Sequence, residues 1–160
     1  MRPTATVTPP EHLRATALRL LARREYARAE LELRLARRGA EPADIACVLD
    51  ALERDGYLSD ARYAQMIVTN KSGRYGRRAI AHALRERGVA PETARTALDA
   101  LHGNDELSEA RALVARRFAA PPRDERDRAR RIRFLIARGY GVAVAREAVC
   151  GTRSCEPDGD

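Results

Sequence analysis

The amino-acid sequence predicts an all-α protein made of three tandem three-helix repeats, helix-turn-helix-like in type, that form an elongated array. Its composition favours helices over sheets, because aromatic residues make up only 4% of the chain and strand-forming residues are too scattered to give alternating runs. The pattern Leu-x-x-Arg-Gly recurs at Gly39, Gly88 and Gly139, with spacings of 49 and 51 residues. A nearly fixed period of this length is typical of helical repeats.

The first repeat is expected over residues 11–56. Its first helix contains Leu13, and its second runs from an N-cap at Ala27 to Gly39, which ends the helix in a left-handed conformation. The third helix starts at Pro42, because the first turn of a helix tolerates a residue without an N–H. Its apolar residues have the spacing of an amphipathic helix and are Ile45, Val48, Leu49 and Leu52.

The second repeat is expected over residues 57–103, with the same order of helices. The Ser59–Asp60 pair supplies a capping oxygen and negative charge at the start of its first helix. The second helix is predicted between an N-cap at Gly76 and a C-terminal Gly88. The third starts at Pro91, as its counterpart does in the first repeat.

The third repeat is expected over residues 104–150. Asn104 is the capping residue of its first helix, and the second helix is predicted between an N-cap at Asp127 and a C-terminal Gly139. The third helix continues the register of the earlier repeats with Ala145, Ala148 and Val149. The chain should therefore contain three units of one design.

Residues 1–10 and 151–160 flank the repeats and are predicted to be a disordered leader and a disordered tail. The leader lacks the apolar block of a signal peptide, and no apolar stretch of the chain approaches the roughly 20 residues of a membrane span. Cys47, Cys150 and Cys155 form an odd set without a CxxC pair, which is typical of a reducing compartment. We therefore expect a cytoplasmic protein that is not bound to a membrane.

No constellation of catalytic residues is visible in the sequence. The three histidines, His12, His82 and His102, fall in different repeats, and no pair has the spacing of a metal site or of a base beside a nucleophile. The glycine-rich loops that bind phosphate in nucleotide-dependent enzymes are also missing. We expect no enzymatic activity, no catalytic residue, no metal and no cofactor.

The chain has a net charge of +7, and the excess lies in the second and third repeats. Residues 11–56 are balanced, whereas residues 57–104 and 105–150 each have a net charge of +4. Arginine can donate two hydrogen bonds to one phosphate, and a tyrosine within a basic segment can stack on a base. The residues predicted to contact nucleic acid or a partner protein are Lys71, Arg74, Tyr75, Arg77, Arg78, Arg85, Arg130 and Arg133.

Helical spacing puts most of these arginines on polar helix faces. Arg78, His82 and Arg85 should lie opposite Ile80, Ala83 and Leu84, and Arg130 and Arg133 opposite Ile132, Leu135 and Ile136. Two other interpretations of this basic stripe stay open. A chain rich in arginine also has solvated basic faces without a function, and an acidic protein surface attracts such a stripe as well as nucleic acid does.

Three segments together resemble the RecX family. They are REYARAELELRLARRG at residues 24–39, LERDGYLSDARYA at residues 52–64 and GRRAIAHALRERGV at residues 76–89. The resemblance covers about residues 11–150 and is weakest in the third repeat. Ala27 stands where similar proteins usually have a capping serine, which removes one side-chain cap from that helix start.

The resemblance implies a regulator that binds the RecA filament on single-stranded DNA and inhibits or modulates the recombinase and coprotease activities of RecA. This would place the protein in homologous recombination, DNA repair and the SOS response. The family picture is a molecule that lies along the filament groove and touches both RecA and DNA. We expect a monomer that reaches single-stranded DNA through the filament.

Two alternative functions stay open at this point. A helix-turn-helix regulator that reads duplex DNA is the first, because three-helix units can place a helix in the major groove. It would need one distinct recognition helix and a dimer, which three similar units do not suggest. A helical scaffold without any nucleic-acid role is the second, and a flat response of binding to salt would favour it.

Overall fold

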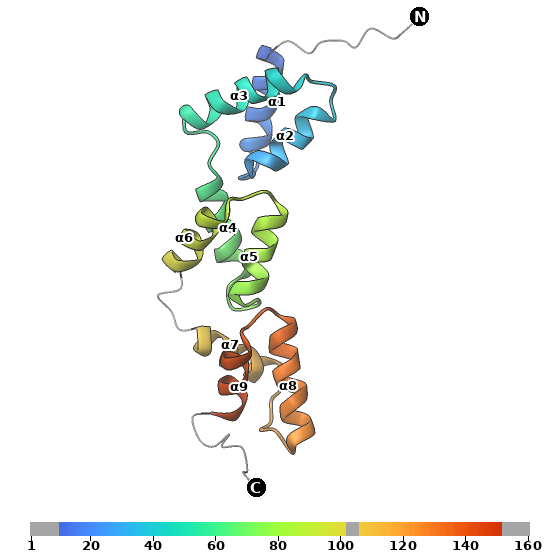
Figure 1. Ribbon diagram of the computed structural model, residues 1–160, viewed down its shortest axis with the longest axis vertical. Helices are drawn as coiled ribbons and strands as arrows, with labels where there is room; N and C mark the ends of the chain where they lie inside the picture. Colours follow the sequence, from blue (N-terminus) through green and yellow to red (C-terminus); the bar gives the residue numbers. More distant parts are fainter. Residues whose placement is uncertain (1–9, 102–105, 152–160) are drawn as a thin grey trace, which may run out of the picture. The chain divides into compact units, whose positions relative to one another are not determined.

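The computed structural model describes residues 10–101 and 106–151, and in these ranges every regular element is an α-helix (Figure 1). The helices are α1 (Pro10–Leu21), α2 (Arg28–Ala36), α3 (Pro42–Arg54), α4 (Asp60–Lys71), α5 (Arg77–Glu86), α6 (Pro91–Leu101), α7 (Glu106–Arg117), α8 (Glu125–Ala137) and α9 (Val142–Cys150). The prediction of an all-helical repeat protein is confirmed. The predicted leader and tail lie outside the described residues except for Pro10 and Gly151, and so do His102, Asn104 and Cys155.

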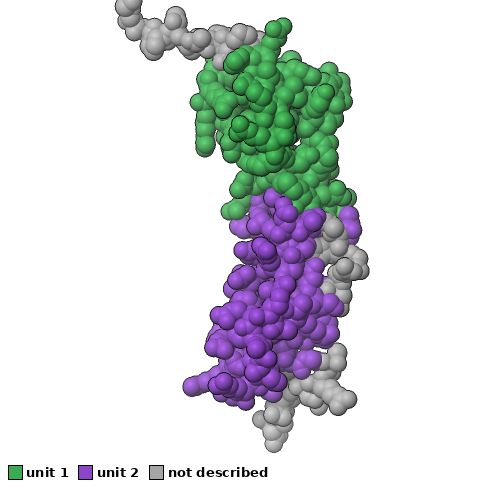
Figure 2. Space-filling model, turned by 180° about the vertical axis from the view of Figure 1, so that it is seen from behind, with its two compact units in different colours: residues 1–66, 84–97 green, residues 67–83, 98–160 purple. Residues whose placement is uncertain are grey.

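The chain divides into two compact units, shown in green and purple in Figure 2. Unit 1 contains residues 1–66 and 84–97, and unit 2 contains residues 67–83 and 98–160. The division passes through α4, α5 and α6, so the second group of three helices contributes to both units. Among the described residues, no helix combines the length and the apolar character that are needed to cross a membrane.

The core of unit 1 lies between α1, α2 and α3. The apolar residues predicted for α3 are all buried, and they pack with Leu13 of α1 and with Leu31 and Leu35 of α2. Leu31 and Leu35 are separated by one helical turn, so both point to the same side of α2. The i, i+3, i+4 spacing in the sequence therefore identified the helix face that is buried. Removal of this apolar face from water is the main source of stability in this core.

A second core lies in unit 2 between α7, α8 and α9. Leu135 of α8 and Ala145 of α9 are fully buried in it, together with Tyr140 from the turn between these helices. Phe118 and Phe134 flank this core and meet edge to face, with ring centroids 5.6 Å apart. Ile136 was predicted on the same apolar face, but this was wrong, because its side chain is 39% exposed.

The three repeated glycines end α2, α5 and α8 as predicted. All three have positive φ, which is +79° at Gly39, +76° at Gly88 and +88° at Gly139. Side chains other than glycine rarely adopt this conformation, so the glycines set the position of each helix end. Pro42 and Pro91 are the first residues of α3 and α6, which confirms the predicted helix starts.

The predicted N-cap of α8 was wrong. Asp124, not Asp127, is the capping residue, and its side chain accepts a hydrogen bond from the backbone N–H of Asp127. The prediction assumed one length for the second helix of every repeat, whereas α8 has 13 residues and α2 has 9. The extra residues lengthen α8 at its N-terminus and place Asp127 in the first turn.

Candidate nucleic-acid interface

Residues 72–76 form the loop between α4 and α5, and this loop is held against the turn between α8 and α9 in unit 2. The N–H of Gly76 donates to the carbonyl of Arg138 at 2.9 Å, and the N–H of Arg78 donates to the carbonyl of Gly139 at 3.2 Å. A Cβ atom on Gly76 would lie 2.5 Å from the backbone of Gly139. Only glycine allows the two backbones to approach this closely.

The same loop is also held by α7. The N–H of Gly73 donates to the carboxylate of Glu109 at 3.3 Å, and the guanidinium of Arg116 donates to the carbonyl of Gly73. Glu106, the first residue of α7, accepts the N–H of Arg77 at 3.2 Å. These bonds satisfy backbone groups that the end of α4 and the start of α5 leave open. The loop is therefore fixed by the third repeat on two sides.

Tyr75 projects from this fixed loop with 37% of its side chain exposed. The ammonium of Lys71 lies 4.9 Å from the centroid of its ring, and the guanidinium carbon of Arg138 lies 5.5 Å from it. Both distances are within the range of cation–π contacts. The result is an exposed aromatic ring with two cations beside it, an arrangement that suits both the bases and the phosphates of a single strand.

Arg138 was not among the predicted contact residues. It lies next to Gly139 in the Leu-x-x-Arg-Gly pattern, where it was attributed to the helix end alone. No spacing in the sequence relates it to Tyr75, because 63 residues separate the two. Only the packing of the α8–α9 turn on the α4–α5 loop brings them together.

Arg74 and Arg78 are exposed on and beside this loop. Neither guanidinium has an ion-pair partner among the described residues, so both are available to an outside anion. Arg77 differs, because its guanidinium pairs with Asp99 and donates to the carbonyl of Leu98 at 3.2 Å. A phosphate bound at Arg77 would therefore have to compete with contacts inside the protein.

Arg85 lies on the same face of α5 as Arg78, seven residues further on. Both side chains are exposed, whereas Ile80 and Leu84 are fully buried, which confirms the predicted division of α5 into a basic and an apolar face. Arg85 belongs to unit 1, however, while Arg78 belongs to unit 2.

Arg130 and Arg133 are on α8, and Arg133 is exposed as predicted. Arg130 pairs with Asp127 at 2.9 Å, and its guanidinium lies 5.3 Å from the ring of Phe118. Eight residues of helix, or about 12 Å, separate Arg130 from Arg138. The structure therefore does not bring Arg130 together with the Tyr75 loop, and Arg130 lines a separate pocket.

A comparison with known proteins defines the class to which this structure belongs. Residues 14–52 match the family model described as RecX, first three-helix domain, and residues 59–98 match that described as RecX, second three-helix domain. Solved structures agree in fold, and a crystal structure of RecX from Lactobacillus salivarius superimposes with a TM-score of 0.77 at 18% identity, covering 88% of this chain and 94% of that one. The chain is thus a protein of tandem three-helix domains.

Related sequences define the family. The chain is 34% identical over 151 residues to the regulatory protein RecX of Ralstonia nicotianae, which is 94% of either chain. It is 41% identical to that of Leptothrix cholodnii, covering 91% of this chain and 92% of the relative, and 46% identical to that of Chromohalobacter salexigens, covering 85% and 90%. The chain belongs to the RecX family, whose members compared here are named regulatory proteins.

Proposed function

We propose that this protein binds the RecA filament on single-stranded DNA and restrains the recombinase and coprotease activities of RecA. Its membership of a family of regulatory proteins supports a regulatory role, and the RecX resemblance supplies RecA as the partner. On this proposal the protein acts by binding alone, without a cofactor, in the cytoplasm during DNA repair and the SOS response. It works as a monomer that needs no dimer interface.

The observation that carries the nucleic-acid part of the proposal is the exposed ring of Tyr75 beside Lys71 and Arg138. A base that stacks on the ring displaces a cation that now lies over it, and the displaced cation can then pair with a neighbouring phosphate. Arg74 and Arg78, whose guanidinium groups have no ion-pair partner in the described part of the chain, extend this positive surface along the strand. Because the loop is fixed by backbone hydrogen bonds, little conformational entropy is lost when DNA binds.

Occupation of the filament by such a protein blocks access to the DNA inside it. Strand exchange requires a second DNA molecule to reach the strand that is bound in the filament. Repressor cleavage requires the repressor protein to reach the filament as well. A regulator bound along the filament groove competes with both. An alternative mechanism, in which it favours loss of RecA from the growing end, predicts filament shortening rather than a blocked but intact filament.

The test is a titration of the full chain into RecA filaments formed on single-stranded DNA, with ATP hydrolysis and strand exchange as readouts. We expect both activities to fall at or below stoichiometric amounts of the protein. The proposal fails if neither changes when the protein equals RecA in concentration. A footprint on duplex DNA with two symmetric half-sites would instead support the duplex-reading regulator.

A further inference from the structure

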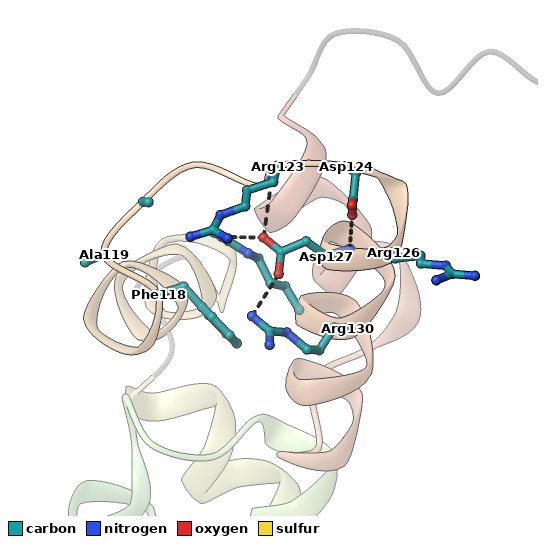
Figure 3. Close-up of a pocket in the computed structure, with 9 residues that line it drawn as sticks. Phe118, Ala119, Arg123, Asp124, Arg126, Asp127 and Arg130 are labelled. Atoms are coloured by element: carbon teal, nitrogen blue, oxygen red, sulfur yellow. Dashed lines mark hydrogen bonds and ion pairs between the residues drawn. The ribbon is translucent and has the colours of Figure 1, made fainter.

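A second concentration of arginine lies in unit 2, away from the Tyr75 loop. A pocket with a volume of about 640 Å³ opens between the segment that follows α7 and the first turns of α8 (Figure 3). Its charged lining residues are Arg123, Asp124, Arg126, Asp127, Arg130 and Arg131. Pockets of about 300–1,000 Å³ are the usual size for small ligands. Four arginines and two aspartates are among these residues, so the lining has a net positive charge.

Both aspartates are already engaged within the protein. Asp124 accepts the backbone N–H of Asp127 at 2.8 Å as the cap of α8. Asp127 accepts hydrogen bonds from Arg131 at 2.7 Å and from the backbone N–H of Arg123 at 3.3 Å, and it pairs with Arg130 at 2.9 Å. The single carboxylate of Asp127 is thus shared by two guanidinium groups, which leaves positive charge uncompensated.

Few of the donors of these arginines have a recorded partner within the described part of the chain. The guanidinium groups of Arg123 and Arg126 have no carboxylate partner among the described residues, and Arg126 points away from Asp127 in Figure 3. Arg131 gives one hydrogen bond to Asp127 and Arg130 forms an ion pair with it, although a guanidinium group has five N–H donors. Asp127 therefore orients two arginines without exhausting their capacity to bind an anion.

Arg131 is the buried arginine of this pocket. Only 5% of the residue is exposed, it lines the pocket, and its Nε has no hydrogen-bond partner among the described residues. A buried donor without a hydrogen-bond partner is rare in folded proteins. The guanidinium carbon of Arg131 also lies 4.8 Å from the centroid of the Phe118 ring, and this contact limits the movement of the side chain.

We propose that this pocket in the third repeat is an oxyanion site that binds a phosphate group. Arginine forks match the geometry of phosphate, and four arginines against two aspartates leave the lining with positive charge for it. Base stacking is not its role, because Phe118 packs against the core between α7, α8 and α9 and meets Phe134 edge to face, whereas Tyr75 is exposed. This site goes beyond the proposed contact with RecA and needs no filament.

The experiment measures binding of inorganic phosphate to the full chain by calorimetry and by the shift in melting temperature. Acetate and chloride at equal ionic strength are the comparison anions. The pocket variant is Arg123→Gln with Arg130→Gln. The control variant is Arg128→Gln with Arg146→Gln, which removes the same charge from exposed positions of α8 and α9 that do not line the pocket.

We expect phosphate to bind the unchanged chain and the control variant, and to bind the pocket variant at least about tenfold more weakly, because two charged donors are lost. The proposal is overturned if acetate binds as well as phosphate does, or if the pocket variant binds phosphate normally. Circular dichroism verifies that the helices of both variants are intact. None of these readouts involves RecA, so this proposal and the proposed function fail separately.

A second arm identifies the source of the phosphate group. The protein is titrated with an oligonucleotide that has a 5′-phosphate and with the same strand without it. Tighter binding of the phosphorylated strand, absent in the pocket variant, assigns the site to the end of a DNA strand. If inorganic phosphate binds but the oligonucleotides with and without a 5′-phosphate bind equally well, the site is assigned to free phosphate.

Discussion

Asp60 caps a helix to which it does not belong. It is the first residue of α4, but its Oδ1 accepts the backbone N–H of Arg28, the first residue of α2, at 2.7 Å. Ala27, the N-cap of α2, has no side chain that could do this. Ser59 meanwhile caps α4 itself, since its Oγ accepts the N–H of Arg62 at 3.3 Å. The missing cap at Ala27 is thus supplied from the next repeat.

Replacing Asp60 with alanine should lower the free energy of unfolding by about 1 kcal/mol, because the N–H of Arg28 loses its partner. Urea denaturation followed by circular dichroism measures this. Asp60→Asn is the matched control, since it keeps an oxygen acceptor and should lose less. Equal losses in the two variants would show that the charge of Asp60, not its hydrogen bond, is what matters.

Replacing Gly76 with alanine should lower the free energy of unfolding by about 1–3 kcal/mol, as overpacked side chains do. The new Cβ would lie 2.5 Å from the carbonyl group of Gly139, and backbone cannot move aside cheaply. Gly141→Ala is the control, because a Cβ there meets nothing within 4 Å and its φ of −64° suits alanine. Thermal melts of the two variants make the comparison, and similar melting temperatures would refute the close approach.

Replacing Tyr75 with alanine should weaken the binding of single-stranded DNA by about tenfold, which corresponds to the loss of one stacked base at about 1–3 kcal/mol. Tyr75→Phe keeps the ring and should bind as the unchanged chain does. Fluorescence anisotropy with a labelled oligonucleotide provides the affinities. If phenylalanine is as damaging as alanine, the hydroxyl group and not the ring makes the contact.

Replacing both Arg74 and Arg78 with glutamine should reduce the salt dependence of binding to single strands. Each phosphate contact contributes about 0.7 to the slope of log affinity against log salt, so the slope should become less steep by about 1.4. The control is Arg37→Gln with Arg38→Gln, two exposed arginines of the first repeat. The basic loop is not the binding surface if the control changes the slope as much.

Tyr140 makes stability depend on pH in alkaline solution. Burial, with a smaller effect of the charges of Glu109 and Glu106, raises its pKa from 10.0 to about 12. The folded state therefore holds this proton more tightly than the unfolded state, and its contribution is present below pH 10 and is lost as the pH rises toward 12.

Tyr140→Phe should reduce this alkaline loss, and a remainder is expected because burial also raises the pKa of Tyr63. At pH 8 the substitution should change stability by less than about 1 kcal/mol, because the buried hydroxyl has no hydrogen-bond partner among the described residues. Unfolding free energies at pH 8 and pH 11 provide the test. Tyr57→Phe, at a side chain that is 52% exposed, is the control and should leave the alkaline loss in place. An unchanged loss in Tyr140→Phe would assign it to another group.

The helices could be predicted from the sequence because their signals are local. A glycine at a helix end and a proline at a helix start act on their own backbone, and an apolar stripe depends only on the helical period. Gly39, Gly88 and Gly139 were therefore placed correctly, and so was the buried face of α3. The N-cap of α8 was missed because helix length is not set by the repeat period.

The candidate site was only partly predictable, because its decisive contacts join segments that are distant in the sequence. Lys71 and Tyr75 are only four residues apart, and a turn at the end of α4, in which the N–H of Tyr75 donates to the carbonyl of Lys71 at 3.1 Å, keeps them close. The contact between Arg138 and Tyr75 depends on how a turn of the third repeat packs. Burial of Arg131 was also unexpected, because arginine in a basic helix suggests a solvated side chain.

Asp60 and Glu106 each accept a hydrogen bond from the first backbone N–H of a helix in the preceding repeat, and this affects how truncated forms of the protein should be interpreted. A chain cut after α3 keeps every residue of α2 but loses Asp60, which accepts a hydrogen bond from the first backbone N–H of α2. A chain cut after α6 likewise keeps α5 but loses Glu106, which accepts the first backbone N–H of α5. Removal of one repeat therefore weakens its predecessor as well. A loss of activity after such a truncation therefore arises partly from the destabilised repeat that remains. Point substitutions at surface residues consequently locate binding contacts more reliably than deletions do.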